Sequence, residues 1–152
     1  MNYQLREVAE AAKSFIDVPF IHQGRGREEG MDCIGLVIAA YEAVGWTPLS
    51  PNTTYVDNYR MIPEGAMIED YMALEADLVE RKDAGPGDVV LMRFAKEPQH
   101  LGVLADGPPG TEGLYMVHSV NGAMGAEGVV MCSYDIKHQQ RTKSIWRLRG
   151  GI

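Results

Sequence analysis

The sequence has only two cysteines, Cys33 and Cys132, among 152 residues. Two cysteines so far apart do not indicate the disulfide framework of a small secreted domain, so each needs its own explanation. The sequence also lacks a run of about 18 apolar residues, and its start lacks a basic stretch followed by an apolar one. We therefore expect no membrane-spanning helix and no export by the usual secretory route.

Basic residues are few as well. Lys and Arg number 14 against 21 Asp and Glu, which gives a net charge of −7. Nucleic-acid binding needs a clustered basic face, so we expect no nucleic-acid partner. Hydrophobic residues at 45% and charged residues at 23% are typical of a globular domain. No repeat or domain boundary is visible, which predicts one domain over residues 1–152.

The first part of the sequence predicts a helix and then a loop. Between residues 4 and 17, apolar residues recur at steps of three and four, which is the pattern of an amphipathic helix. Pro19 is expected to close this helix. The polar, glycine-dotted stretch 22–30 predicts a loop, and its spacing matches neither phosphate-binding fingerprint.

Two further helices are expected before residue 85. The stretch 32–44 is apolar almost all round, which predicts a helix buried on every side. Asp32 is suited to its N-cap and Gly45 to its C-terminal stop. The segment 46–84 is interpreted as an insertion, irregular at first and then helical from Met67 to near Arg81.

From residue 89 onward the pattern changes to short apolar runs separated by links rich in Gly, Pro and Asp. Such runs predict strands, and their brief connections predict an antiparallel meander. The chain is therefore expected to be an α+β domain, with helices packed on a five-stranded, mainly antiparallel sheet. The five predicted strands are 89–94, 101–105, 114–120, 129–134 and 144–148.

Cys33 occupies the first turn of the predicted buried helix. A helix N-terminus stabilises a thiolate, so a cysteine placed there can serve as a nucleophile. A base must then come from elsewhere in the fold, and His100 and His118 lie on two strands expected to be neighbours. In this hypothesis His100 takes the thiol proton and His118 orients His100. Taken one at a time, all three residues are also compatible with structural roles.

The remaining candidates receive structural interpretations. Cys132 lies in an apolar strand with no helix N-terminus near it, so we expect it in the core. His138 lies in a polar turn and is expected to be solvated. A zinc site of Cys33, His100 and His118 is disfavoured, because no two of them have the close spacing of zinc ligands.

Four blocks of the sequence, in order, resemble the NlpC-type family of papain-like cysteine peptidases. They are VPFIHQGRGREEGMDCIGLV, PGDVVLM, QHLGVL and YMVHSV, and they span residues 19–119. The resemblance implies an endopeptidase that cuts the stem peptides of bacterial peptidoglycan without a cofactor or metal. It assigns Cys33 as nucleophile, His100 as base and His118 as the residue that orients the base. Pro86, Gly87 and Asp88 would be structural turn residues.

The sequence departs from the family at Phe20, where the family usually has a Tyr that helps to bind the oxyanion. His22 or Gln23 could replace that donor, together with the Cys33 backbone N–H. The stretch PFIHQGR resembles the bacteriophage tail and prophage branch, which implies a virion location and tail-tip proteins as partners. Arg25 and Arg27 are either clamps for substrate carboxylates or solvated loop charges.

Two other functions remain open at this stage. A structural tail-tip protein that keeps the fold without cutting anything is favoured by Phe20. An acyltransferase or amidase could use the same Cys–His pair on another ester or amide, since fold alone does not select a substrate.

Overall fold

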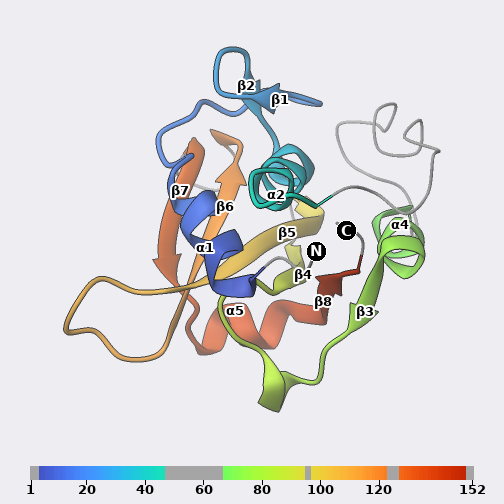
Figure 1. The fold of residues 1–152 in the computed structure, drawn as a ribbon, viewed down its shortest axis with the longest axis vertical. Coiled ribbons are helices and arrows are strands. Elements are labelled where there is room, and N and C mark those ends of the chain that lie inside the picture. The colour runs from blue at the N-terminus through green and yellow to red at the C-terminus, as the bar shows by residue number, and fades with distance from the viewer. Residues whose placement is uncertain (1–3, 47–66, 95–96, 123–126, 150–152) are drawn as a thin grey trace.

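The structure is a computed structural model that describes residues 4–46, 67–94, 97–122 and 127–149. Helices come mainly from the first half of the chain and strands from the second (Figure 1). In chain order the elements are α1 (Leu5–Lys13), β1 (Arg25–Gly26), β2 (Gly30–Met31), α2 (Cys33–Glu42), α4 (Met67–Glu75), β3 (Ala76–Leu78), η1 (Arg81–Asp83), β4 (Val89–Phe94), β5 (Glu97–Asp106), β6 (Leu114–Val120), β7 (Gly128–Ser133), α5 (Ile136–Arg141) and β8 (Thr142–Leu148).

Within the described residues, the main sheet has six strands in the order β3-β8-β4-β5-β6-β7, and neighbouring strands are all antiparallel. Helices α1 and α2 contact each other, and both contact β5 and β6 (Figure 1). Helix α5 contacts β4. The predicted α+β class with an antiparallel sheet is confirmed. No helix in the described ranges is long and apolar enough to cross a membrane.

The five predicted strands all form, but the sheet gains a sixth, β3, where the sequence predicts helix. The helix that begins at Met67 ends at Glu75 rather than near Arg81. Leu74 and Leu78 continue the apolar spacing of this helix, but they are 56% and 68% exposed. The spacing therefore does not indicate a helix face that is buried in the core. Residues 76–78 pair instead with β8, because an unpaired strand edge leaves backbone donors and acceptors unsatisfied.

The first helix is also shorter than expected. It ends at Lys13, and Asp17 then adopts a left-handed conformation with φ of 80°. The backbone N–H of Asp17 donates to Val129 O, and Val129 N donates to Val18 O. Pairing with the start of β7 thus takes these residues out of the helix. The part of the predicted insertion at residues 47–66 lies outside the described residues.

Apolar residues on the two faces of the main sheet belong to two different clusters. The larger cluster joins α1 and α2 to Leu101, Val103 and Val117, and we call this side the α2 face. The smaller cluster contains Val90, Met92, Leu104, Met116, Tyr134 and Ile145, with Phe94 and Cys132 packed against it. We call that side the α5 face, because His138 of α5 packs on the rings of Phe94 and Tyr134.

Candidate active site

The start of α2 is held by the side chain of Asp32. Asp32 is the N-cap, and its Oδ1 accepts the backbone N–H of Gly35 at 2.8 Å. Its Oδ2 accepts the backbone N–H of Gln23 at 2.8 Å, and Arg25 donates to Oδ1 at 3.1 Å. The predicted cap is confirmed, and the same carboxylate also fixes the preceding loop. As a result Cys33, buried as the first residue of α2, has a fixed position.

Gly35 allows the loop and the helix to approach each other closely. A Cβ on Gly35 would lie 2.1 Å from the carbonyl oxygen of Gly24, which is closer than any real contact. Only glycine, which has no side chain, leaves space for this close approach. The loop predicted from the polar stretch 22–30 is present, and it contains the small hairpin β1–β2.

The two predicted histidines lie side by side. His100 Nε2 and His118 Nδ1 are 2.8 Å apart, and both side chains are buried. They come from β5 and β6, which are adjacent antiparallel strands. The expected neighbourhood is confirmed, whereas the catalytic roles stay predictions. Because Nε2 of His100 is engaged with His118, its Nδ1 is the ring nitrogen suited to take a proton from a nucleophile.

Both histidines and the start of α2 are at the same end of the sheet. His100 is near the start of β5 and His118 near the end of β6, and antiparallel strands bring these positions together. Ser119 Oγ donates to the carbonyl oxygen of Met31 at 2.7 Å, so the residue after His118 is bonded to the chain just before Cys33. Sequence reasoning missed Ser119, because a lone Ser in a strand gives no such signal.

The two histidine rings and the core around Cys33 belong to different faces. Cys33 is in the cluster of the α2 face, with Leu101 and Val117. Side chains alternate along a strand, so His100 and His118 point toward the α5 face. The ring of Phe94, which packs against the cluster of that face, contacts the ring of His100. A contact between the Cys33 thiol and His100 would therefore be made around the end of the sheet.

Two sequence predictions need correction at His118. Cys132 is half-buried rather than part of the core, and its Sγ lies 3.5 Å from His118 Nε2. His138 is not a solvated turn residue, because its ring contacts those of His118 and Tyr134 and its Nε2 is 3.9 Å from Cys132 Sγ. Helix α5, which the sequence did not reveal, brings His138 to this position.

The pKa values of these groups show which protons they carry. Burial, together with the nearby His100 and His138, lowers the pKa of His118 to about 3, so His118 is neutral near pH 7. Burial and the Asp135 carboxylate raise the pKa of Cys132 to about 11, so Cys132 stays a thiol. Burial also raises the pKa of Asp32, against the hydrogen bonds and Arg25 that favour its carboxylate.

The loop residues are placed as follows. The backbone N–H of Gln23 donates to Asp32, and His22 interacts electrostatically with the same carboxylate, so both lie near the residue that precedes Cys33. Arg25 pairs with Asp32 as a structural partner. Arg27 binds Ser14 and lies over the ring of Phe15, so it fastens the loop to the end of α1. Neither arginine is simply a solvated loop charge.

The turn at residues 86–88 has the structural role expected from the sequence. Asp88 is fully buried, and Arg147 donates to its two oxygens at 2.7 and 2.9 Å. Gly87 has a φ of 96°, and its carbonyl oxygen accepts the hydroxyl of Tyr41. The turn thereby joins α2, β4 and β8.

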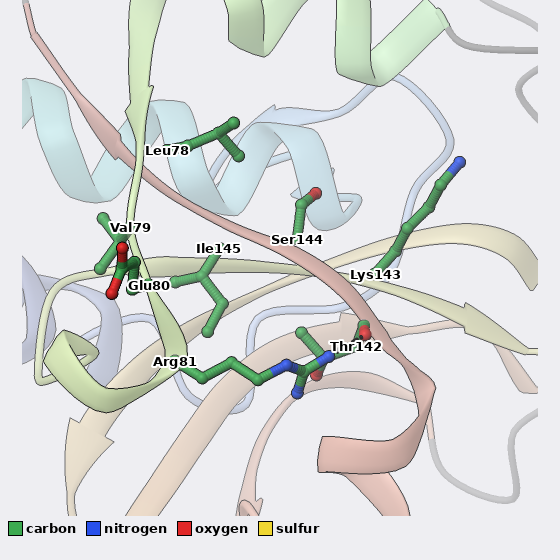
Figure 2. A pocket seen from close by; sticks show the side chains of 8 residues that line it. All are labelled: Leu78, Val79, Glu80, Arg81, Thr142, Lys143, Ser144 and Ile145. Atoms are coloured by element: carbon green, nitrogen blue, oxygen red, sulfur yellow. Dashed lines mark hydrogen bonds between the residues drawn. The ribbon is translucent and has the colours of Figure 1, made fainter.

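A pocket of about 640 Å³ lies elsewhere, along β3 and β8 (Figure 2). It is lined by residues 78–81 and 142–145, and none of the candidate catalytic residues lines it. The Arg81 guanidinium donates to the carbonyl oxygens of Gln139 and Thr142 and so holds the start of β8. Within the described ranges, no group of three or more His, Cys, Asp or Glu side chains is arranged to hold a metal ion.

The chain resembles several solved structures, each with 14–17% identity, which shows a shared fold. A Staphylococcus aureus protein described as similar to lipoprotein, of the NLP/P60 family, matches with a TM-score of 0.59 over 95% of this chain and 41% of its own. NlpC1 from Trichomonas vaginalis matches with a TM-score of 0.62 over 97% of this chain and 45% of its own. This chain thus spans less than half the length of either protein.

The NlpC/p60 domain of the peptidoglycan hydrolase SagA has the same extent as this chain. It matches with a TM-score of 0.55 and 17% identity, over 93% of this chain and 97% of the domain. No curated protein sequence matches significantly. The family model described as NlpC/P60 family matches residues 17–144, a range that includes the α2 N-terminus and both paired histidines. The chain therefore belongs to the NlpC/P60 family of cysteine peptidases.

Proposed function

We propose that this protein is a peptidoglycan endopeptidase, with Cys33 as nucleophile, His100 as general base and His118 as the residue that orients His100. The observation that carries the proposal is the buried His100–His118 pair at 2.8 Å, at the sheet end where α2 begins with Cys33. The family match and the likeness to a domain named as part of a peptidoglycan hydrolase support the substrate class.

The reaction follows from the chemistry of these groups. The N-terminus of α2 favours the thiolate of Cys33, and His100 Nδ1 takes the thiol proton. The sulfur then bonds to the carbonyl carbon of the scissile amide, and the C–N bond breaks as His100 returns the proton to the leaving amine. Water, deprotonated by His100, hydrolyses the thioester and frees Cys33. His118, neutral at pH 7, keeps the ring of His100 in one orientation.

The oxyanion donors are a separate part of the proposal, because Phe20 has no hydroxyl. The backbone N–H of Cys33 is one donor in this scheme, and His22 or Gln23 supplies the other. Their support is position, since both lie in the loop that Asp32 fastens to the start of α2. A His22→Ala enzyme with unchanged turnover would remove His22 from this role.

Cys132 is the rival nucleophile, because its Sγ lies 3.5 Å from His118 Nε2. Two observations count against it. Its thiol pKa is raised to about 11, so the reactive thiolate is scarce at neutral pH. It also lies within strand β7, whereas Cys33 is the first residue of helix α2, where a negative charge is stabilised.

The test is digestion of defined stem peptides and of purified peptidoglycan, with products identified by mass spectrometry. We expect Cys33→Ala to abolish product formation and Cys132→Ala to retain it at a reduced rate. Iodoacetamide at pH 6 should label Cys33 faster than a free thiol, and Cys132 more slowly. If wild type and Cys33→Ala give identical products, the hydrolase assignment is wrong. A silent, structural tail-tip protein would then be the better interpretation.

The setting of the reaction is a second part of the proposal. The stretch PFIHQGR, similar to the phage tail and prophage branch of the family, supports a virion protein that acts on the host wall during genome entry. Mass spectrometry of purified particles from the source host should detect this chain in the tail fraction. Its presence only in the host cell wall fraction would overturn the virion location.

A further inference from the structure

A line of polar side chains connects α5 to the histidine pair. Asp135 Oδ1 is 2.8 Å from His138 Nδ1, and His138 Nε2 is 3.9 Å from Cys132 Sγ. The same sulfur is 3.5 Å from His118 Nε2, and His118 Nδ1 is 2.8 Å from His100 Nε2. Each distance is within hydrogen-bond range for its atoms, the sulfur contacts being the long ones. The line ends at the residue assigned as base, so the inference below rests on the proposed function.

The direction of these hydrogen bonds follows from the group at the outer end. Two hydrogen bonds from His138, one from its backbone N–H and one from its ring, lower the pKa of Asp135, so the carboxylate is ionised and can only accept. The Nδ1 of His138 is therefore the donor. In the neutral form of His138 the other ring nitrogen, Nε2, carries a lone pair and accepts the S–H of Cys132.

The same logic continues across the sheet. A thiol that donates to His138 has its sulfur lone pairs available to His118, so His118 Nε2–H donates to Cys132 Sγ. The Nδ1 of neutral His118 then accepts Nε2–H of His100. His100 is left with its lone pair on Nδ1, the tautomer that can accept a proton from a thiol.

We propose that Asp135, His138 and Cys132 are positioning residues that fix the tautomers of His118 and His100 through this directed chain of hydrogen bonds. If the chain ran the other way, the Cys132 thiol would donate to His118 Nε2 and His118 Nδ1–H would donate to His100 Nε2. His100 would then carry its proton on Nδ1 and could not act as the base toward Cys33. A catalytic histidine that carries its proton on the wrong ring nitrogen strongly lowers the reaction rate.

Packing around the His138 ring keeps this series of hydrogen bonds in place. The ring of His138 lies against those of Phe94, Tyr134 and His118, with centroid distances of 6.3, 6.5 and 6.4 Å. Asp135 is also the N-cap of α5, so the carboxylate at the outer end is fixed by the turn that begins the helix. Cys132 lies on β7, and Asp135 and His138 belong to the N-cap and first turn of α5. Neither element carries Cys33 or His100.

The test uses His138→Phe, which keeps an aromatic ring but removes the acceptor for Cys132. The primary readout is the imidazole ¹⁵N chemical shifts of His118 and His100 in the full chain, which report tautomers without substrate. Wild type should have His118 protonated on Nε2, and His138→Phe should shift it toward Nδ1–H. Asp135→Ser, which keeps an N-capping side chain, should act in the same direction. Lys137→Ala, an exposed neighbour on α5, is the matched control and should change nothing.

Kinetics give a second readout. Loss of one such hydrogen bond should lower kcat by roughly 3- to 10-fold with KM within about twofold, since in this proposal the positioning residues act through His100 and not on substrate binding. The double variant Cys132→Ala/His138→Phe should be no slower than Cys132→Ala, because His138 acts through the sulfur. Unchanged His118 tautomers in His138→Phe, or additive effects in the double variant, would overturn the inference. A wild type that cleaves nothing would instead defeat the proposed function, while the ¹⁵N shifts would still decide the tautomers.

Discussion

At the scale of single residues, His118 is a buried group whose protonation opposes folding. Its pKa is about 3 in the folded chain, below the ordinary histidine value of 6.5. Between these two values the unfolded chain binds a proton that the folded chain does not. The contribution to stability is therefore complete above about pH 6.5 and is lost as the pH falls. The pKa of Asp32 is raised in the folded chain, so the protonation of Asp32 at lower pH favours folding.

We expect the free energy of unfolding to fall by up to about 1.4 kcal/mol per pH unit below pH 6 because of His118. Urea unfolding at pH 7.5, 6 and 5 measures this dependence. In a His118→Gln variant the free energy of unfolding should fall less steeply with decreasing pH, because glutamine does not titrate. Parallel pH dependences in the two proteins would show that His118 does not bind the extra proton on unfolding.

At the scale of elements, the start of α2 depends on a loop and a helix that touch through their backbones. Gly24 and Gly35 approach so closely that a methyl group on Gly35 would meet the Gly24 carbonyl oxygen. Asp32 then fastens that loop through the N–H of Gln23. The nucleophile position and the candidate oxyanion loop are therefore one unit.

Gly35→Ala should destabilise the protein even though alanine is the better helix former. The intrinsic preference favours alanine by about 1 kcal/mol, whereas overpacking against backbone costs typically about 1–3 kcal/mol. A Cβ only 2.1 Å from the Gly24 carbonyl oxygen places the overpacking cost at the upper end of this range, so we expect a net loss of about 1–2 kcal/mol in urea unfolding, with slower cleavage of stem peptides as the loop shifts. Gly26→Ala is the matched control, because a Cβ there has open space around it. Equal stability of the two variants would contradict the close-approach argument.

The elements also show where prediction from local pattern fails. The apolar spacing of Leu74 and Leu78 predicts a continued helix, yet residues 76–78 form β3. The free edge of β8 is far away in sequence, so no local signal reveals that it needs a partner. The same applies to α5, whose six residues are too few to show a helical period.

At the scale of the whole molecule, the turn at residues 85–88 joins several elements through one buried carboxylate. Asp88 accepts from Gly85 N and from two nitrogens of Arg147, while Gly87 packs against Leu5 of α1. Such a contact stabilises the arrangement of elements rather than any one of them.

Asp88→Ala should therefore lower global stability without a local effect on the site. Its removal leaves Arg147, whose side chain is 41% exposed and can be hydrated, so we expect a loss of about 2 kcal/mol rather than the larger cost of stranding a buried charge. Thermal and urea unfolding measure it. Lys82→Ala, which breaks an exposed pair with Glu80, should change stability by less than about 0.5 kcal/mol. Similar losses in both variants would contradict the assigned role of Asp88.

The sequence by itself determined the α+β class, the buried helix with its Asp32 cap, and the residues Cys33, His100 and His118 as the candidate set. Local periodicity, capping chemistry and ordered motifs indicate these features, and all three can be recognised before the fold is known. Only the tertiary structure decided that Cys132 and His138 adjoin His118, that Ser119 is bonded to the chain before Cys33, and that β3 completes the sheet. These contacts join residues that are distant in the chain or on different elements, and neither local periodicity nor capping chemistry shows which of these residues will meet.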